Sequence, residues 1–246
     1  MSEEGVGQTR APWWLSRPAC AIKSWFFQLV LTRLVRCYAR PLHIYGIEHL
    51  RRVPGPLIFA AHHESHSDTP IVLAALPQRF RVRLVIAAAA DVLFVNPVSG
   101  ALASLLFGAV PIERKASALA GLREVAELLA GGNSLLIYPL GKCSEDGSIG
   151  KLKSGVGLLA RLTKAPVVPV AIGGSRNVLP LSRRWPRRAA VTVSFAAPRS
   201  YAHESAEAFA EDLQQEISPL ATSRSSTERC RLAACMARAH YALHWS

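Results

Sequence analysis

The chain has 246 residues and a formal net charge of +12, from 29 Lys and Arg against 17 Asp and Glu. Half of the residues are hydrophobic and only 19% are charged, which excludes an intrinsically disordered chain and predicts one folded domain with terminal additions. The excess of positive charge predicts an anionic partner. Aromatic residues make up only 7% of the chain, and most Trp residues lie near its ends or beside Arg, so we expect a membrane surface and not a nucleic acid.

The first patterned segment, residues 13–38, predicts an amphipathic helix, because apolar residues recur at helical spacing among Lys and Arg. No charge-free window approaches the roughly 20 residues that span a bilayer, and Pro18 is expected to divide the segment. Two interpretations are open: a helix that lies in the membrane interface, or one that packs on the domain's own core. We favour the interface, since one buried face does not accommodate all the aromatic residues of the segment, which are Trp13, Trp14, Trp25, Phe26 and Phe27.

Beyond this segment, short apolar runs alternate with helical patterns, which predicts an α/β fold with a mixed, mostly parallel sheet flanked by helices. Strands are expected at 57–61, 83–89, 110–112, 134–138, 167–172 and 189–195. Helices are expected at 69–76, 98–107, 116–130, 154–163 and 203–217. The uncharged stretch 92–112 is long enough for a transmembrane helix, but Gly and Pro interrupt it, so we expect only the short helix.

A cluster of polar residues follows the first predicted strand, at the edge where α/β proteins place their sites. It contains His63 and Asp68, which would lie about 140° apart on a regular helix and could not touch there. An imidazole in the loop can, however, meet a carboxylate in the first turn of the next helix. Asp68 would then bind one ring N–H of His63 and leave the other ring nitrogen as a general base toward a substrate hydroxyl.

Two other interpretations of this cluster stay open. His62 and His66 have the i, i+4 spacing of two zinc ligands, but the sequence is one residue short of the H-E-x-x-H pattern and offers no obvious third ligand. A polar, solvated turn with one or two helix-capping residues is the other alternative. We favour the pair of base and carboxylate, and we expect neither a metal ion nor a redox cofactor.

Residues 41–195 resemble the glycerolipid acyltransferases related to 1-acyl-glycerol-3-phosphate acyltransferase. His63 and Asp68 match the H-x4-D signature of that family, although the preceding residue, commonly Asn, is His62 here. Three further blocks are similar, at 107–114, 138–144 and 168–172. The resemblance implies transfer of a fatty acyl group from acyl-CoA or an acyl-carrier protein to a hydroxyl of a lysophospholipid-like acceptor, with His63 and Asp68 as the catalytic residues.

The same resemblance implies where the acceptor binds. The expected substrate-binding residues are Arg114, at the end of the second block, and Gly141, Lys142 and Ser144 in the third. The family usually reads F-P-E-G-T-R-S in the third block, whereas this chain has Leu140 at the acidic position and Cys143 at the Arg position. Because Cys cannot supply the bidentate fork of Arg, we expect an altered choice of acceptor. A catalytically weakened lipid-binding homologue and a metal-dependent hydrolase remain the alternatives.

Three parts are therefore expected: an interfacial helical anchor at 1–40, an acyltransferase domain at 41–218 and a basic tail at 219–246. The Arg-rich loop 183–188, which also contains Trp185, is expected to press on anionic lipid headgroups. The five cysteines are odd in number and form no C-x-x-C, which indicates a reducing compartment. We therefore expect a peripheral or monotopic protein at the cytoplasmic face of a membrane.

Overall fold

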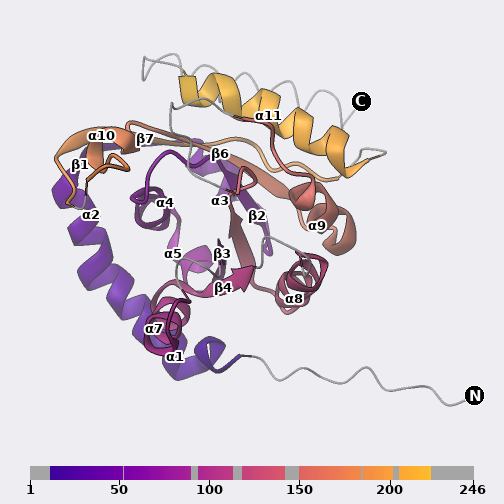
Figure 1. Ribbon diagram of the computed structural model, residues 1–246, viewed down its shortest axis with the longest axis horizontal. Helices are drawn as coiled ribbons and strands as arrows, with labels where there is room; N and C mark the ends of the chain where they lie inside the picture. Colours follow the sequence, from indigo (N-terminus) through magenta and orange to yellow (C-terminus); the bar gives the residue numbers. More distant parts are fainter. Residues whose placement is uncertain are drawn as a thin grey trace, which may run out of the picture.

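The computed structural model describes residues 12–51, 53–89, 94–112, 118–141, 150–183, 185–201 and 205–222. Within this part of the chain, seven strands form one sheet in the order β1-β7-β6-β2-β5-β3-β4 (Figure 1). The strands are β1 (Ala39–Tyr45), β2 (Ile58–Ala61), β3 (Leu84–Ala89), β4 (Ala109–Ile112), β5 (Ser134–Ile137), β6 (Val167–Gly173) and β7 (Ala189–Phe195). Every neighbouring pair is parallel except β6 and β7. The predicted mixed, mostly parallel sheet is confirmed.

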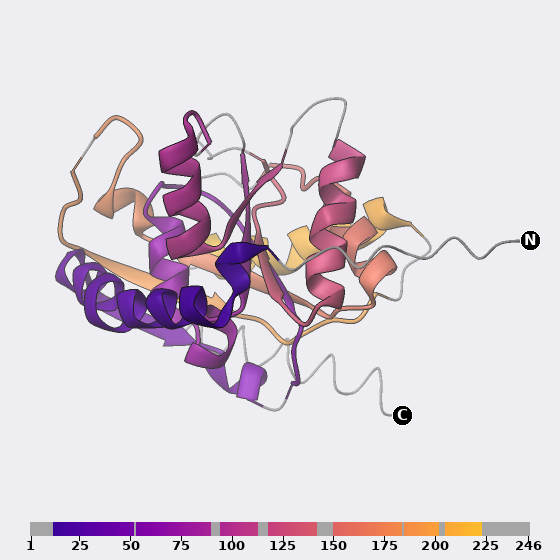
Figure 2. The same ribbon diagram turned by 90° about the horizontal axis from the view of Figure 1, so that it is seen from below.

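Helices cover both faces of this sheet (Figures 1 and 2). One face carries α4 (Asp68–Ala75), α5 (Gln78–Arg81) and an N-terminal helix made of α1 (Arg17–Phe26), η2 (Phe27–Leu31) and α2 (Thr32–Tyr38). The other face carries α8 (Ala118–Ala130), α9 (Gly155–Thr163) and α11 (Ala206–Thr222). The remaining helices are η1 (Trp13–Leu15), α3 (Ile47–Arg51), α7 (Pro97–Phe107), which packs on α1, and α10 (Ser175–Val178).

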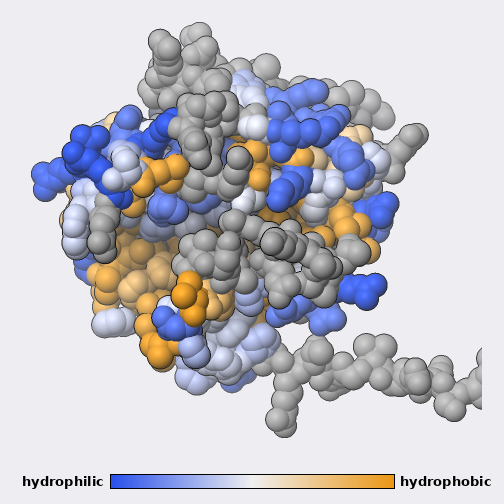
Figure 3. All heavy atoms as spheres, in the orientation of Figure 1, coloured by the Kyte–Doolittle hydropathy of each residue, from blue (hydrophilic) through white to orange (hydrophobic). Residues whose placement is uncertain are grey.

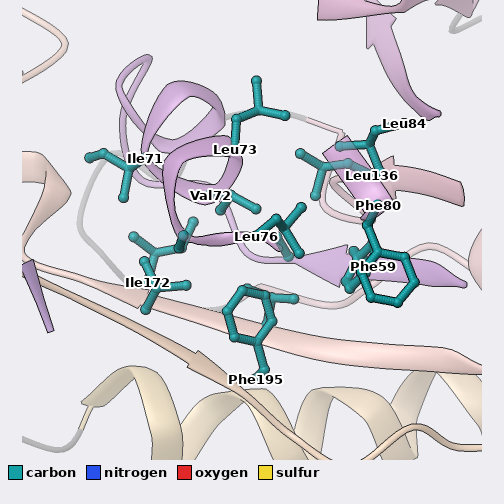
Figure 4. Close-up of a cluster of buried hydrophobic side chains, with 14 of the residues drawn as sticks. Phe59, Ile71, Val72, Leu73, Leu76, Phe80, Leu84, Leu136, Ile172 and Phe195 are labelled. Carbon is teal, nitrogen blue, oxygen red and sulfur yellow. The ribbon is translucent and has the colours of Figure 1, made fainter. Parts of the chain in front are cut away.

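The central strand β2 shows why the predicted strands read as continuous apolar runs. Its four residues are fully buried, and alternate side chains point to opposite faces of the sheet. Phe59 and Ala61 join the cluster under α4, where Phe59 meets Phe80 edge-on at 5.5 Å between ring centroids (Figure 4). Ile58 and Ala60 join the cluster under α8, α9 and α11. A strand buried on both faces needs apolar residues at every position.

The N-terminal helix packs on the domain's core along one side only. Its buried side chains recur every four residues, namely Ala19, Lys23, Phe27, Leu31 and Val35. Trp14 is buried too, whereas Trp25 is 61% and Leu34 is 54% exposed. The core thus takes Trp14 and Phe27 and leaves Trp13 and Trp25 outside, in agreement with the expectation that one buried face does not accommodate all five aromatic residues. The segment is divided near Pro18, as expected: η1 ends at Leu15, Ser16 is extended, and Pro18 stands in the first turn of α1, where its missing N–H is not needed.

Most of the expected elements are present, and the short helices α3, α5 and α10 are additional to them. Strand β1 was not predicted, because its partly exposed sequence contains Pro41 and lacks a continuous apolar run; at the edge of the sheet such a strand tolerates proline. Helix α11 continues past the expected end at 217 to Thr222. The segment 13–38 also contains the π-helical stretch η2. No helix within the described ranges combines the length and hydrophobicity that a membrane span requires.

Candidate active site

The turn between β2 and α4 holds His63 and Asp68 together at the carboxyl edge of the parallel strands. Strand β2 ends at Ala61, and α4 begins with Asp68, whose side chain is fully buried. The Oδ2 atom of Asp68 accepts a hydrogen bond from His63 Nδ1 at 2.8 Å. It also accepts the backbone N–H groups of Glu64 at 2.7 Å and Ser65 at 2.8 Å. The predicted geometry, an imidazole in the loop over a carboxylate in the first helical turn, is present.

These hydrogen bonds define how the imidazole can act. A carboxylate only accepts, so the bond to Asp68 places the ring proton of neutral His63 on Nδ1. The lone pair for proton transfer then resides on Nε2. The two backbone donors hold the carboxylate in position independently of His63, so the turn sets the orientation of the ring before any substrate binds.

Tyr138, for which no role was predicted, packs directly on the imidazole. Its ring stacks on the His63 ring at 4.3 Å between centroids with 25° between planes. Its hydroxyl shares a hydrogen bond of 2.8 Å with Thr69 Oγ1 in the first turn of α4. Tyr138 follows β5, the neighbour of β2, with Ala60 level with Ile137. The order of strands in the sheet, and not the spacing in the sequence, reveals this contact.

His62 is a buried structural residue in this arrangement. Its Nδ1 accepts the backbone N–H of Ile172 at 3.3 Å, so its proton is on Nε2, which lies 3.1 Å from Glu64 Oε1. Coordination of a metal ion by His62 would break one of these bonds, and His66 is exposed on the surface of the turn. Among the described residues, no three His, Cys, Asp or Glu side chains are grouped so as to hold a metal ion.

Two serines tie the turn to the segment after β6. Ser65 Oγ donates to the carbonyl of Leu179 at 2.7 Å and lies 2.9 Å from Ser67 Oγ. Ser67 Oγ is also 3.4 Å from the carbonyl of Ser175. Both serines are buried, so their hydroxyl groups need these partners. The loop that follows α10 is thereby connected to the turn that carries His63.

The expected substrate-binding residues are only partly placed by the structure. Arg114, Lys142 and Ser144, with Cys143, lie outside the described residues. Gly141 is described: it has a φ of 71°, and its N–H bonds the carbonyl of Tyr138 at 2.9 Å. Lys153 lies so close that a Cβ on Gly141 would come within 2.8 Å of its Nζ. Lys153, which comes well after the third block in the sequence, is therefore the cation beside that block in the described part.

The backbone N–H groups near His63 are mostly engaged within the turn. Those of Glu64 and Ser65 bind Asp68, that of Ser67 binds Ser65 Oγ, and that of Asp68 binds the carbonyl of Ser65. These groups are thus unavailable to stabilise an oxyanion without rearrangement.

Comparison with known proteins shows which family the chain resembles. Residues 41–173, more than half of the chain, match the family model described as Acyltransferase. The chain belongs to the acyltransferase family. It is 31% identical over 139 residues to a chloroplastic 1-acyl-sn-glycerol-3-phosphate acyltransferase of Brassica napus, and 30% identical over 141 residues to one of Arabidopsis thaliana. Each match covers 56% of this chain and 38% of the relative, so the chain shares well under half of their length.

A solved structure extends the likeness of this acyltransferase-family chain to most of its length. The crystal structure of the 1-acyl-sn-glycerophosphate (LPA) acyltransferase PlsC from Thermotoga maritima superposes with a TM-score of 0.62 at 20% sequence identity. The match covers 83% of this chain and 81% of that one. At this identity the likeness concerns the fold. It agrees with the mixed sheet flanked by helices that the sequence predicts.

Proposed function

We propose that the protein transfers a fatty acyl group from an acyl thioester, acyl-CoA or an acyl-carrier protein, to a hydroxyl of a lysophospholipid-like acceptor. The observation that carries this proposal is the bond between His63 Nδ1 and Asp68 Oδ2, within a turn fixed by two backbone donors. The curated relatives, named as 1-acyl-sn-glycerol-3-phosphate acyltransferases, support the substrate class.

His63 Nε2 takes the proton of the acceptor hydroxyl as the oxygen attacks the thioester carbonyl. Asp68 stabilises the imidazolium that forms, because its carboxylate faces Nδ1–H. Collapse of the tetrahedral intermediate breaks the carbon–sulfur bond, and the proton on Nε2 passes to the departing thiolate. Arg114 of the second block and Lys142 of the third bind the phosphate of the acceptor, together with Gly141 and Ser144 of the third block.

The test is incubation of the protein with labelled acyl-CoA and a panel of lysolipids, read by mass spectrometry. His63→Ala and Asp68→Asn should each lower turnover by roughly 10²–10⁴-fold, the usual effect of losing a general base. His43→Ala is the matched control, since His43 is exposed on β1 at the far edge of the sheet. Near wild-type turnover in either variant contradicts the mechanism.

Two further results would select the alternatives. If a chelator abolishes the activity and a divalent metal restores it, a metal-dependent hydrolase explains the data better. If the protein binds lysolipid vesicles but transfers no acyl group to any acceptor, it is a lipid-binding homologue whose catalysis has been lost.

We also propose that the protein docks peripherally on the cytoplasmic face of an anionic membrane. Hydrophobic residues gather over the N-terminal helix and α7 in Figure 3, with hydrophilic residues above them over the loop between α10 and β7. The exposed apolar residues of these helices are Ile22, Trp25, Leu29, Val30, Leu34, Val98 and Leu102. In the loop, Trp185 is 82% exposed beside the exposed Arg183 and Arg187. Apolar side chains beside cations suit a surface of anionic headgroups.

Sedimentation with phosphatidylglycerol vesicles tests this docking. Trp25→Ser combined with Leu34→Ser should weaken binding by roughly tenfold or more for each side chain that no longer enters the lipid. Leu162→Ser is the control, because Leu162 is 56% exposed on α9, close to the 54% of Leu34. Salt should weaken the remaining binding, since exposed charges are screened over about 10 Å at 0.1 M. Equal binding by the double variant and the wild type would exclude the N-terminal helix as an anchor.

A further inference from the structure

Tyr138 is connected to the catalytic pair at two points. Its ring covers one face of the His63 imidazole, with centroids 4.3 Å apart and planes 25° from parallel. Its hydroxyl reaches Thr69 Oγ1 at 2.8 Å. Thr69 is the residue after Asp68, which holds the Nδ1 edge of the same imidazole. His63, Asp68, Thr69 and Tyr138 are therefore connected in a ring by two hydrogen bonds, one peptide bond and the stack of the two aromatic rings.

The hydrogen bond to Asp68 and the stack on Tyr138 restrain different motions of the imidazole. The bond to Asp68 fixes one edge of the ring but permits rotation about the axis of that bond. A parallel ring at stacking distance opposes this rotation, because turning the imidazole would drive its edge into the face of Tyr138. The bond to Thr69 in turn anchors Tyr138 to the first turn of α4. The direction of Nε2 is therefore set by two elements, α4 and the end of β5.

The stack also has an electrostatic consequence. The face of a phenol ring carries negative partial charge and attracts a cation placed over it. His63 becomes a cation each time it removes a proton from the acceptor hydroxyl. The ring of Tyr138 thus favours the protonated form of His63 relative to an apolar side chain of similar size.

We propose that Tyr138 is a positioning residue for His63, which holds the imidazole in line with the acceptor hydroxyl and stabilises the imidazolium through its ring face. Only the kinetic part of this proposal rests on the proposed function. Other titratable groups also face His63 from the described part of the chain: Asp68 on α4, and His66 in the turn with its ring centroid 6.5 Å away. Glu64 lies in the turn as well, and its carboxylate is bound to His62.

Three variants separate the two roles. Tyr138→Leu removes the aromatic face while it still excludes water from His63. Tyr138→Phe keeps the face and removes the hydroxyl. Thr69→Val removes the partner of that hydroxyl with almost no change in shape. Circular dichroism and thermal melting establish that each variant is folded, and His66→Gln identifies any contribution of the second imidazole to the titration.

The kinetic readout is the pH profile of kcat. In Tyr138→Leu the acid limb should move to lower pH by about half a unit, the shift expected for the loss of an exposed interaction between a cation and an aromatic face. Its plateau should fall between about ten- and a hundredfold, with the KM for acyl-CoA within about twofold, because a misdirected base slows chemistry and not donor binding. Tyr138→Phe and Thr69→Val should leave the acid limb in place. A Tyr138→Leu profile with the limb and plateau of the wild type would overturn the proposal.

A second readout does not depend on acyl transfer. The His63 Cε1–H resonance, assigned with His63→Gln, reports the titration of the ring by NMR. Its midpoint should fall in Tyr138→Leu by the same half unit, and the upfield ring-current shift should vanish there but persist in Tyr138→Phe. If the wild type transfers no acyl group, the proposed function fails while this titration still decides the stacking. An unchanged midpoint and chemical shift in Tyr138→Leu would refute it.

Discussion

Lys23 offers a direct test of how the N-terminal helix is attached to the domain. The residue lies on α1 with no exposed surface, and its Nζ is 3.4 Å from the carbonyl of Leu84 and 5.8 Å from the centre of the Trp14 ring. A Cβ on Gly108, at the C-terminus of α7, would come within 3.0 Å of Nζ. Burial lowers the pKa of Lys23 from 10.5 to about 8. The contact between the N-terminal helix and the domain therefore buries an ammonium group whose charged form is more stable in water.

The size of the effect of Lys23 on the free energy of unfolding follows from proton linkage. A pKa lowered from 10.5 to about 8 corresponds to about 3 kcal/mol of unfavourable free energy for the charged form in the folded state. Between these values the unfolded chain binds more protons than the folded one. The contribution of Lys23 to stability therefore rises as the pH increases from 8 toward 10.5, and it is constant below 8. Between pH 7 and pH 10 the gain is about 2.5 kcal/mol.

Denaturant unfolding of the wild type and Lys23→Met at pH 7 and pH 10 measures this contribution. Met keeps the apolar stem and removes the charge, so the variant should be the more stable protein at pH 7. Its advantage should shrink by about 2.5 kcal/mol at pH 10. Lys151→Met is the control, because Lys151 is exposed and pairs with Glu211; it should show no comparable change. A difference between wild type and Lys23→Met that is the same at both pH values would refute the reasoning.

Two further substitutions test the packing and the acceptor site. Gly157→Ala in α9 should destabilise the fold by about 1–3 kcal/mol in thermal or denaturant unfolding, because the added Cβ would meet the backbone oxygen of Ala206 at 2.4 Å and α11 would have to move. Leu140→Glu combined with Cys143→Arg should raise kcat/KM for lysophosphatidic acid by about tenfold, since a charge-assisted bond contributes roughly 1.5–3 kcal/mol. If the wild type already prefers that acceptor and the double variant gains nothing, the third block does not select the phosphate.

The apolar strands and the turn that holds His63 and Asp68 could be predicted because their physical causes are local. A strand buried on both faces is mostly apolar, and β2, β3, β5, β6 and β7 all lie within one or two residues of the expected bounds. His63 and Asp68 meet because the chain changes direction between a strand and a helix, and a five-residue separation suffices for that. The bond between them needs no partner from elsewhere in the sequence.

What escaped prediction depends on contacts between distant segments. Strand β1 pairs with β7, some 150 residues away, and its own residues are too polar for a strand to be predicted from them. Lys23 is one of the Lys and Arg residues interleaved with the apolar residues of segment 13–38, but its ammonium group lies beneath Trp14, beside the end of α7. Composition alone gives no sign that a lysine will be buried. Tyr138 belongs to the same class, since only the adjacency of β2 and β5 places it on His63.

The substitution of His62 for the commonly found Asn is best understood through the hydrogen bonds that the position must make. The side chain must accept the N–H of Ile172 from β6 and donate toward Glu64 in the turn, and it does so while buried. A neutral imidazole has one acceptor and one donor on opposite sides of its ring, and an amide also provides both. Either side chain can therefore link β6 to the turn without a charge. His62 in place of Asn therefore preserves the hydrogen bonds of the turn. Leu140 and Cys143, in contrast, replace charged groups by uncharged ones. We therefore expect the choice of acceptor to differ because of those two positions.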